Sequence, residues 1–256
     1  MPRRIMLTIA YDGTDYHGFA RLKEDPDTIE GNIDRAIKKV TGETVEITGA
    51  SRTDSGVHAL CNAAVFDTES SVPAFNFTDA LNTKLPPDIR IRRSTEVPGD
   101  FHPRHTDTLK TYRYEIDNER TADPLRSRYS MLVGYALDTD SMNRAGAELV
   151  GEHDFKSFCS VHTQAASTVR TVTGIEVIRD GTCSERIYIM VRGHGFLYNM
   201  VRIIAGTLID VGRGRLAPED VTDILYAADR TKNPCPTAEA KGLTLMDIEF
   251  LGLEDR

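Results

Sequence analysis

The chain has 256 residues, of which 40% are hydrophobic and 27% are charged, and its formal net charge is −8. This composition is ordinary for a soluble globular protein, and the length allows one large domain or two small ones. No apolar run reaches the length of a membrane-spanning helix, and Met1 to Ile5 lead directly into a strand-like pattern without a signal-peptide core. We therefore expect a cytoplasmic protein without membrane contact.

The cysteines give no sign of a metal or redox site. The four cysteines lie far apart and form no C-x-x-C pair. His153, Cys159 and His162 lie close in sequence, but their spacing matches no common metal-binding pattern. We expect surface histidines and a buried thiol here, and no bound metal.

The negative net charge argues weakly against a polyanionic partner, but the charge is uneven. Between Ile89 and Arg113 there are six Lys and Arg residues against three Asp and Glu, and five arginines lie between Arg186 and Arg215. A basic groove on an acidic body is compatible with nucleic-acid binding. Ordinary solvated faces would give the same counts, so both interpretations stay open.

The first hundred residues alternate between strand and helix patterns. Thr28 is a suitable N-cap for an amphipathic helix that Gly42 ends. The hydrophobic spacing predicts strands at 5–11, 43–48, 60–66 and 89–93, and helices at 29–40 and around 77–81. The order β-α-β-β-α-β is that of ferredoxin-like folds, including RNA-recognition domains.

The pattern breaks between Pro98 and Pro103, and we place a domain boundary there, which gives domains 1–102 and 103–256. The second half is again mixed. It predicts strands at 111–116, 169–178, 186–192 and 243–250 and helices at 141–150, 197–211 and 218–227, with Pro218 at the first helical position. The expected fold class is α+β, with two ferredoxin-like α/β domains, antiparallel sheets and an active-site cleft between them.

The segment from Gly49 to Ala59 is the strongest candidate for chemistry. It places Arg52, Asp54 and His58 within seven residues. A carboxylate beside an arginine stays ionised near neutral pH, which suits a nucleophile or an electrostatic stabiliser better than a general acid. Taken alone, however, an aspartate in such a loop more often caps a turn.

Three segments of the second half could complete a site. Arg202 lies inside an apolar helix pattern, where it needs an anionic partner or must reach solvent. Tyr112 alternates with basic residues along a strand, which suits either base stacking or a core position. Leu243 follows a loop that could line a cleft, and Lys241 beside it is equally an ordinary surface residue.

Taken together, these motifs resemble the tRNA pseudouridine synthase A family over nearly the whole chain. The resemblance rests on the segments Tyr11-Asp12-Gly13, Arg52 to Ala59, Phe101 to Arg104, Tyr112-Arg113-Tyr114, Gly151 to Phe158, Gly195 to Arg202 and Thr237 to Leu243. The chain departs from the family at Phe19-Ala20, where Trp-Gln is usual, and at Ser51 and Ser55, where Gly and Ala are usual.

The resemblance implies an enzyme that isomerises uridine to pseudouridine at nucleotides 38, 39 and 40 of tRNA. It implies a homodimer that uses no metal or cofactor. By the same resemblance, Asp54 is the catalytic carboxylate and Arg202 pairs with it. Tyr112 packs on the target uracil, Leu243 lines the uracil pocket, and Arg52 assists flipping of the nucleotide. We also expect His58 to contact the substrate.

Three alternatives remain at this point. A non-catalytic RNA-binding protein would need the aromatic residues but not Asp54 with Arg202. The same chemistry could act on other RNA positions. A sugar-processing hydrolase would normally need two carboxylates, and the sequence offers no convincing second one.

Overall fold

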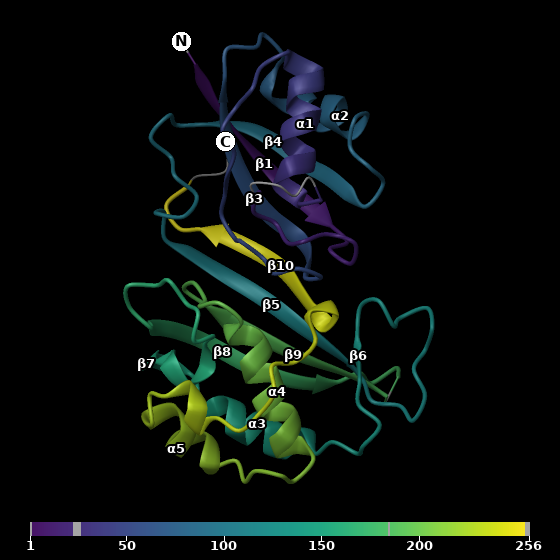
Figure 1. The fold of residues 1–256 in the computed structure, drawn as a ribbon, viewed down its shortest axis with the longest axis vertical. Helices are drawn as coiled ribbons and strands as arrows, with labels where there is room; N and C mark the ends of the chain where they lie inside the picture. The colour runs from purple at the N-terminus through teal and green to yellow at the C-terminus, as the bar shows by residue number, and fades with distance from the viewer. Residues whose placement is uncertain (1, 23–26, 184, 254–256) are drawn as a thin grey trace. The chain divides into compact units, whose positions relative to one another are not determined.

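The computed structural model describes residues 2–22, 27–183 and 185–253 as a mixed α/β protein with five α-helices in this part of the chain. The chain folds into two compact units (Figure 1). Unit 1 comprises residues 1–108 and 245–256, and unit 2 comprises residues 109–244. Residues 245–250 of the last strand therefore group with unit 1, and the first two residues of that strand group with unit 2.

The sheet of unit 1 contains β1 (Arg3–Tyr11), β3 (His58–Thr68) and β4 (Ile89–Val97), in the antiparallel order β4-β1-β3. The short β2 (Thr48–Gly49) pairs with β3, and β10 (Leu243–Phe250) is a further neighbour of β3. Two helices accompany these strands, α1 (Ile29–Thr41) and α2 (Phe77–Asn82), and the 3-10 turn Ala74–Asn76 leads into α2. The order of elements over the first hundred residues is the predicted one.

Helix α1 has the predicted ends. The Thr28 hydroxyl accepts a hydrogen bond from the Gly31 N–H at 3.1 Å, which makes it the N-cap. Gly42 has φ of 80°, and its N–H donates to the Lys38 carbonyl oxygen at 2.9 Å. Ile33 and Ile37 on the inner face are fully buried, so the helix is held by its apolar stripe.

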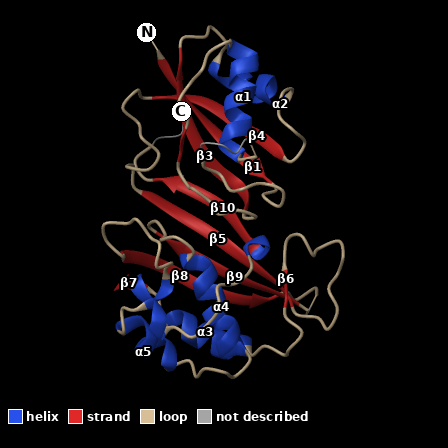
Figure 2. Cartoon of the chain, viewed as in Figure 1, coloured by secondary structure: helices blue, strands red, loops and turns tan. Residues whose placement is uncertain are grey.

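Unit 2 has a second set of strands in the order β5-β9-β8-β7. These strands are β5 (Thr108–Asp117), β9 (Arg186–Gly193), β8 (Val169–Arg179) and β7 (Gly151–Asp154). Neighbouring strands are antiparallel, except that the short β6 (Met131–Leu132) pairs with β5 in parallel. Three helices group together in this unit, α3 (Thr139–Ala147), α4 (Met200–Gly212) and α5 (Asp220–Tyr226) (Figure 2). The 3-10 turns Phe155–Phe158, Arg230–Lys232 and Ala240–Gly242 complete it.

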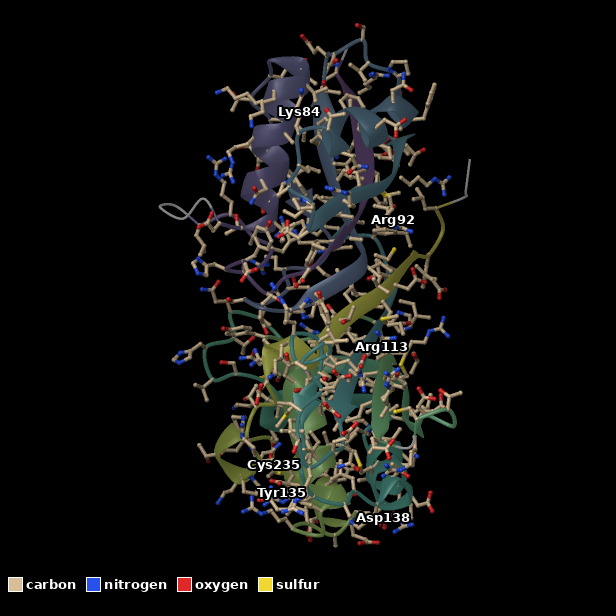
Figure 3. All side chains as sticks on the ribbon, turned by 90° about the vertical axis from the view of Figure 1, so that its right-hand side faces the viewer. Lys84, Arg92, Arg113, Tyr135, Asp138 and Cys235 are labelled. Atoms are coloured by element: carbon tan, nitrogen blue, oxygen red, sulfur yellow. The ribbon has the colours of Figure 1, made fainter. Side chains whose placement is uncertain are left out.

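The two faces of β5 differ in character. Tyr112, Tyr114 and Ile116 are buried on one face. On the other face, the guanidinium group of Arg113 lies 5.3 Å from the ring centre of Tyr188 on β9 (Figure 3). The alternation follows from the regular pairing of β5 with β9, since successive strand residues point to opposite faces.

Helix α4 is the most buried helix of unit 2. A Cβ atom at Gly206 would lie 2.0 Å from the Pro236 carbonyl oxygen, so the helix and the 236–238 segment approach more closely than a side chain allows. Helix α4 has 13 mostly apolar residues, which are too few to cross a bilayer. Among the described residues, no helix is long and apolar enough to span a membrane.

Several predicted boundaries were wrong. Residues 43–47 form no strand, because the Glu43 carboxylate, and not its backbone, meets the end of β3 by accepting hydrogen bonds from Thr68 and Glu69. Helix α4 begins at Met200 and not at Leu197, since Asn199 has φ of 61°, which a right-handed helix excludes.

Helices α3 and α5 are shorter than predicted. Helix α3 ends at Ala147, and Gly151 begins strand β7 with φ of 126°. Helix α5 starts at Asp220, whose carboxylate accepts the Ala217 N–H at 2.8 Å. Pro218 therefore precedes the helix and does not occupy its first position.

Candidate functional site

The backbone around Asp54 is fixed on both sides by hydrogen bonds. The Phe19 N–H donates to the Thr53 carbonyl oxygen at 3.1 Å, and the Val57 N–H donates to the Asp54 carbonyl oxygen at 3.1 Å. The Asp54 side chain is half-buried, while Arg52 is exposed. The loop therefore presents its carboxylate from a rigid backbone.

Tyr16 supports the same loop. Its carbonyl oxygen accepts hydrogen bonds from the Ser55 hydroxyl at 3.1 Å and from the Gly56 N–H at 3.3 Å. Its own hydroxyl donates to the Asp88 carboxylate at 2.7 Å. Burial and this carboxylate raise the pKa of Tyr16 well above its ordinary value, so the hydroxyl stays a donor.

A buried polar network joins the loop to the sheet. The Tyr11 hydroxyl lies 2.7 Å from Oγ1 of Thr53 and accepts a hydrogen bond from Nδ2 of Asn62 at 3.1 Å. The same Asn62 amide donates to the Ser51 carbonyl oxygen at 2.9 Å and accepts from the Ser51 N–H at 3.3 Å. Asn62 is fully buried and its amide is hydrogen-bonded on both sides, so this residue specifies the loop conformation, while Oγ of the buried Ser51 has no hydrogen-bond partner among the described residues.

Two glycines permit the close contact between the loop and its support. Gly18 has φ of 93°, and a Cβ atom there would lie 2.8 Å from the Thr53 carbonyl oxygen. A Cβ atom at Gly49 would lie 2.2 Å from Cε1 of Phe19. The phenyl ring of Phe19 fills the space that a side chain at position 49 would need.

His58 lies inside unit 1 with 4% of its surface exposed. Its Nδ1 accepts the Gly13 N–H at 3.0 Å and also lies 3.2 Å from the Asp12 carboxylate. Nδ1 therefore faces both a backbone donor and a carboxylate of the 12–13 turn. These contacts suit a residue that supports the turn at Asp12 and Gly13. Contact of His58 with the substrate stays a prediction.

In unit 2, Tyr112 is buried against Phe196. The two ring centres are 5.3 Å apart and the rings meet edge to face at 88°. Lys110 shares the Tyr112 face of β5, and burial lowers its pKa to about 8. Phe196 thus fixes the ring orientation of the predicted stacking residue.

Arg202 is oriented by its own helix and by the segment after Pro236. Its Nε donates to the Ala238 carbonyl oxygen and its Nη1 to Oδ1 of Asn199, each at 2.9 Å. The Ala238 N–H in turn donates to the Arg202 carbonyl oxygen at 3.1 Å. Asn199 therefore uses its side chain to hold the guanidinium group and does not cap the helix.

Leu243 begins β10 and is buried, with 5% of its surface exposed. It follows Gly242, where a Cβ atom would lie 2.6 Å from the ring of Tyr114. The Tyr114 hydroxyl donates to the Glu239 carbonyl oxygen at 2.8 Å. The segment from Ala238 to Leu243 is thereby held to β5 at one end and to Arg202 at the other.

The structure thus groups the predicted residues into two sets. Arg52, Asp54 and His58 belong to unit 1, and Tyr112, Arg202 and Leu243 belong to unit 2. Sequence reasoning missed Asn62 and Phe196, which hold the loop and the tyrosine ring. Two sequence signals were available for them. Asn62 is a polar residue within an apolar strand, and Phe196 directly follows Gly195, shortly before helix α4.

No metal-binding constellation accompanies these residues. Within residues 2–22, 27–183 and 185–253, no group of three or more His, Cys, Asp and Glu side chains has an arrangement that could hold an ion. The functional groups that the two sets offer are a carboxylate, guanidinium groups, an imidazole and an aromatic ring.

Comparison with known proteins gives these groups a context. A family model described as tRNA pseudouridine synthase matches residues 7–105 and 145–251. The "tRNA pseudouridine synthase A" of Brevibacillus brevis is 45% identical over 248 residues, covering 97% of this chain and 100% of the relative. The protein of that name from Caldicellulosiruptor bescii gives the same identity and coverage. A "tRNA pseudouridine synthase A 2" from Clostridium perfringens is 46% identical over 230 residues, covering 90% of this chain and 93% of the relative.

The family model covers Asp54 and its loop in its first range and Arg202 and Leu243 in its second, while Tyr112 lies between the two ranges. The likeness to the relatives extends over almost the full chain. The chain belongs to the tRNA pseudouridine synthase family, whose members isomerise uridine to pseudouridine.

Proposed function

We propose that the protein converts uridine to pseudouridine in the anticodon stem-loop of tRNA, at nucleotides 38, 39 and 40, with Asp54 as the catalytic carboxylate. The observation that carries this proposal is the half-buried Asp54 side chain on a loop whose backbone is hydrogen-bonded on both sides. Such preorganisation suits a group that must meet a sugar carbon in one geometry.

The reaction breaks the N1–C1′ bond, turns the uracil and forms a C5–C1′ bond. One carboxylate suffices for this sequence. It either attacks C1′ or removes a proton from C2′, and no redox step or group donor is needed. After the new bond forms, the C5 proton leaves and N1 gains one, so the product is an isomer of the substrate.

The other predicted residues have separate tasks in this proposal. Arg202 keeps Asp54 ionised and oriented, since a neighbouring guanidinium group favours the charged carboxylate. Tyr112 holds the detached uracil by stacking, and Leu243 lines its pocket. Arg52, which is exposed, helps to hold the nucleotide out of the stem during base flipping.

The organisation of the protein is part of the same proposal. We propose that both halves are ferredoxin-like domains, 1–102 and 103–256, whose residues act on one uridine. We also propose a cytoplasmic homodimer. The order of elements over the first hundred residues supports the ferredoxin-like assignment of the first half.

The decisive test replaces Asp54 with Ala or Asn and measures tritium release from tRNA that carries [5-³H]uridine. We expect release to stop while tRNA binding persists. Asp67→Asn is the matched control, because Asp67 is an exposed carboxylate of the same unit that pairs with Arg4. Release that continues in the Asp54 variants would reject the catalytic assignment.

The positions need a separate measurement. Mapping of pseudouridines in RNA from a deletion strain should show their loss at nucleotides 38, 39 and 40. Loss at other sites would favour the same chemistry on different RNA positions. An RNA-binding protein without activity would bind tRNA, and its deletion would leave all pseudouridines in place.

A further inference from the structure

A rigid turn at residues 101–106 presents two histidines at the surface of unit 1. Phe101 anchors it, since its ring packs edge to face on Phe250 at 5.2 Å within a buried cluster that includes Val65 and Val97. The Nη1 atom of Arg4 donates to the Phe101 carbonyl oxygen at 2.8 Å. The start of the turn is therefore fixed by packing and by a charge-assisted hydrogen bond.

The turn itself closes on one carbonyl group. The His102 carbonyl oxygen accepts hydrogen bonds from the N–H groups of His105 and Thr106 and from the Thr106 hydroxyl, all at 3.0 Å. As a result the imidazole rings of His102 and His105 stack, with their centres 3.8 Å apart and their planes within 10°. His105 and Arg104 are exposed, and His102 is half-buried.

One hydrogen bond from the backbone orients the His102 ring of this stack. The Arg104 N–H donates to Nδ1 of His102 at 3.2 Å, so Nδ1 is an acceptor and Nε2 bears the proton of a neutral ring. The pKa of His102 lies below its ordinary value, because of desolvation and then the positive fields of His105, Arg104 and Arg4. A second positive charge at stacking distance is costly unless an anion is present.

The carboxylates that neighbour the turn act on its arginines. Asp67 accepts two hydrogen bonds from Arg4, from Nε at 2.8 Å and from Nη2 at 2.7 Å, and is thereby neutralised by that guanidinium group. Asp100 acts on Arg4, and Glu30 on α1 lies in the field of Arg104. Among the residues that the structure describes, no carboxylate forms a hydrogen bond or an ion pair with the ring of His102 or His105.

We propose that His102, Arg104 and His105 form a binding site for a phosphate group of the RNA backbone, and that binding is accompanied by uptake of a proton. The phosphate would receive hydrogen bonds from Nε2 of His102 and from the guanidinium group, and its charge would stabilise one imidazolium in the stack. This inference rests on the proposed function for the choice of tRNA as the ligand.

The test compares wild-type protein with the His102→Gln/His105→Gln double variant, using an unmodified tRNA transcript as the probe. Calorimetry near pH 6.5 in two buffers of different ionisation enthalpy gives the number of protons taken up on binding. We expect wild type to take up more protons than the double variant. Uptake of one proton tightens Kd by at most about tenfold per pH unit, so wild-type affinity should rise on acidification and that of the variant should rise less.

Two further variants separate this site from general effects. His162→Gln removes an exposed histidine of unit 2 and should leave proton uptake unchanged. Arg104→Ala should weaken tRNA binding at every pH. It should also reduce the slope of log Kd against log salt concentration by the amount expected for roughly one lost phosphate contact. The double variant should raise KM and leave kcat at saturating tRNA unchanged.

Equal proton uptake and equal KM in wild type and double variant would overturn the proposal. A fall in kcat with unchanged KM would instead indicate a structural role and would also overturn it. Failure of the Asp54 assignment would appear as persisting tritium release. That result leaves these binding measurements unaffected, so the two proposals can fail separately.

Discussion

The hydroxyl group of Tyr11 lies 2.7 Å from Oγ1 of Thr53, the residue immediately before Asp54. Tyr11 is the last residue of β1 and is 4% exposed, so this contact joins the loop to the centre of the sheet. The hydroxyl also accepts a hydrogen bond from Asn62. Its removal leaves two buried polar groups short of a partner, which costs more than the hydrogen bonds themselves contribute.

Tyr11→Phe should therefore slow pseudouridine formation by several-fold at saturating tRNA and lower the free energy of unfolding by about 1–3 kcal/mol. Single-turnover rates and urea unfolding measure the two effects. Tyr188→Phe is the control, because that hydroxyl makes only a long 3.5 Å contact with Asp180 on the outer face of the unit 2 sheet. A destabilised Tyr11→Phe enzyme with an unchanged rate would show that the loop does not depend on this contact.

Gly206→Ala should destabilise the protein although alanine favours helices. The added Cβ atom would meet the Pro236 carbonyl oxygen at 2.0 Å, and both are backbone positions that cannot rotate away. We expect a net loss of about 1–3 kcal/mol in urea unfolding, the usual range for overpacking. Gly174→Ala on β8, where nothing lies within 4 Å, should change stability by no more than about 0.5 kcal/mol. Equal stabilities of the two variants would contradict the close contact.

Tyr112→Phe and Tyr112→Leu distinguish the ring from the hydroxyl. If stacking on uracil matters, the phenylalanine variant keeps its edge-to-face contact with Phe196 and most of its activity. The leucine variant loses the aromatic face and should lose far more. Tritium release by both variants at saturating tRNA is the measurement, and equal losses would contradict the stacking role.

Lys110 should make stability depend on pH in the alkaline range. Burial lowers its pKa from 10.5 to about 8, so between these values the unfolded chain binds a proton that the folded protein does not. The contribution of Lys110 to the free energy of unfolding therefore rises with pH between about 8 and 10.5, and it is constant below about pH 8. Urea unfolding of wild type and Lys110→Met should show the wild type gaining relative to the variant as pH increases.

Lys84→Met is the control for that comparison, because Lys84 is an exposed lysine of unit 1 (Figure 3). Its difference from wild type should stay flat over the same pH range. A flat difference for Lys110→Met as well would mean that Lys110 keeps an ordinary affinity for its proton.

The sequence predicted well those helices and strands whose ends depend on residues close by in the chain. Thr28 and Gly42 fix the ends of α1 through their own hydrogen bonds and backbone angle, so the sequence could indicate both. β10 has the predicted bounds because its apolar alternation and its neighbours agree. The loop around Asp54 was found for a similar reason, since its charged residues and glycines lie together in the chain.

Elements decided by distant contacts were not predictable in this way. The apolar alternation at Val45 and Ile47 is typical of a strand, yet the Glu43 side chain takes up the hydrogen bonds at the end of β3. Asparagine tolerates the left-handed conformation that Asn199 adopts, but the hydrogen bond of its side chain to the Arg202 guanidinium group is seen only in the structure. The role of Asn62 likewise depends on Ser51 and Tyr11, which only the folded sheet brings to it.

The missing side chain at Gly49 has an evolutionary consequence for Phe19. An alanine at position 49 would collide with the phenyl ring at 2.2 Å, and an even larger ring at position 19 would tighten the same space. The effects of mutations at the two positions therefore depend on each other. A side chain at position 49 is tolerated only after position 19 has changed to a smaller residue. Related sequences should show the two positions changing together, with glycine at 49 wherever position 19 is aromatic.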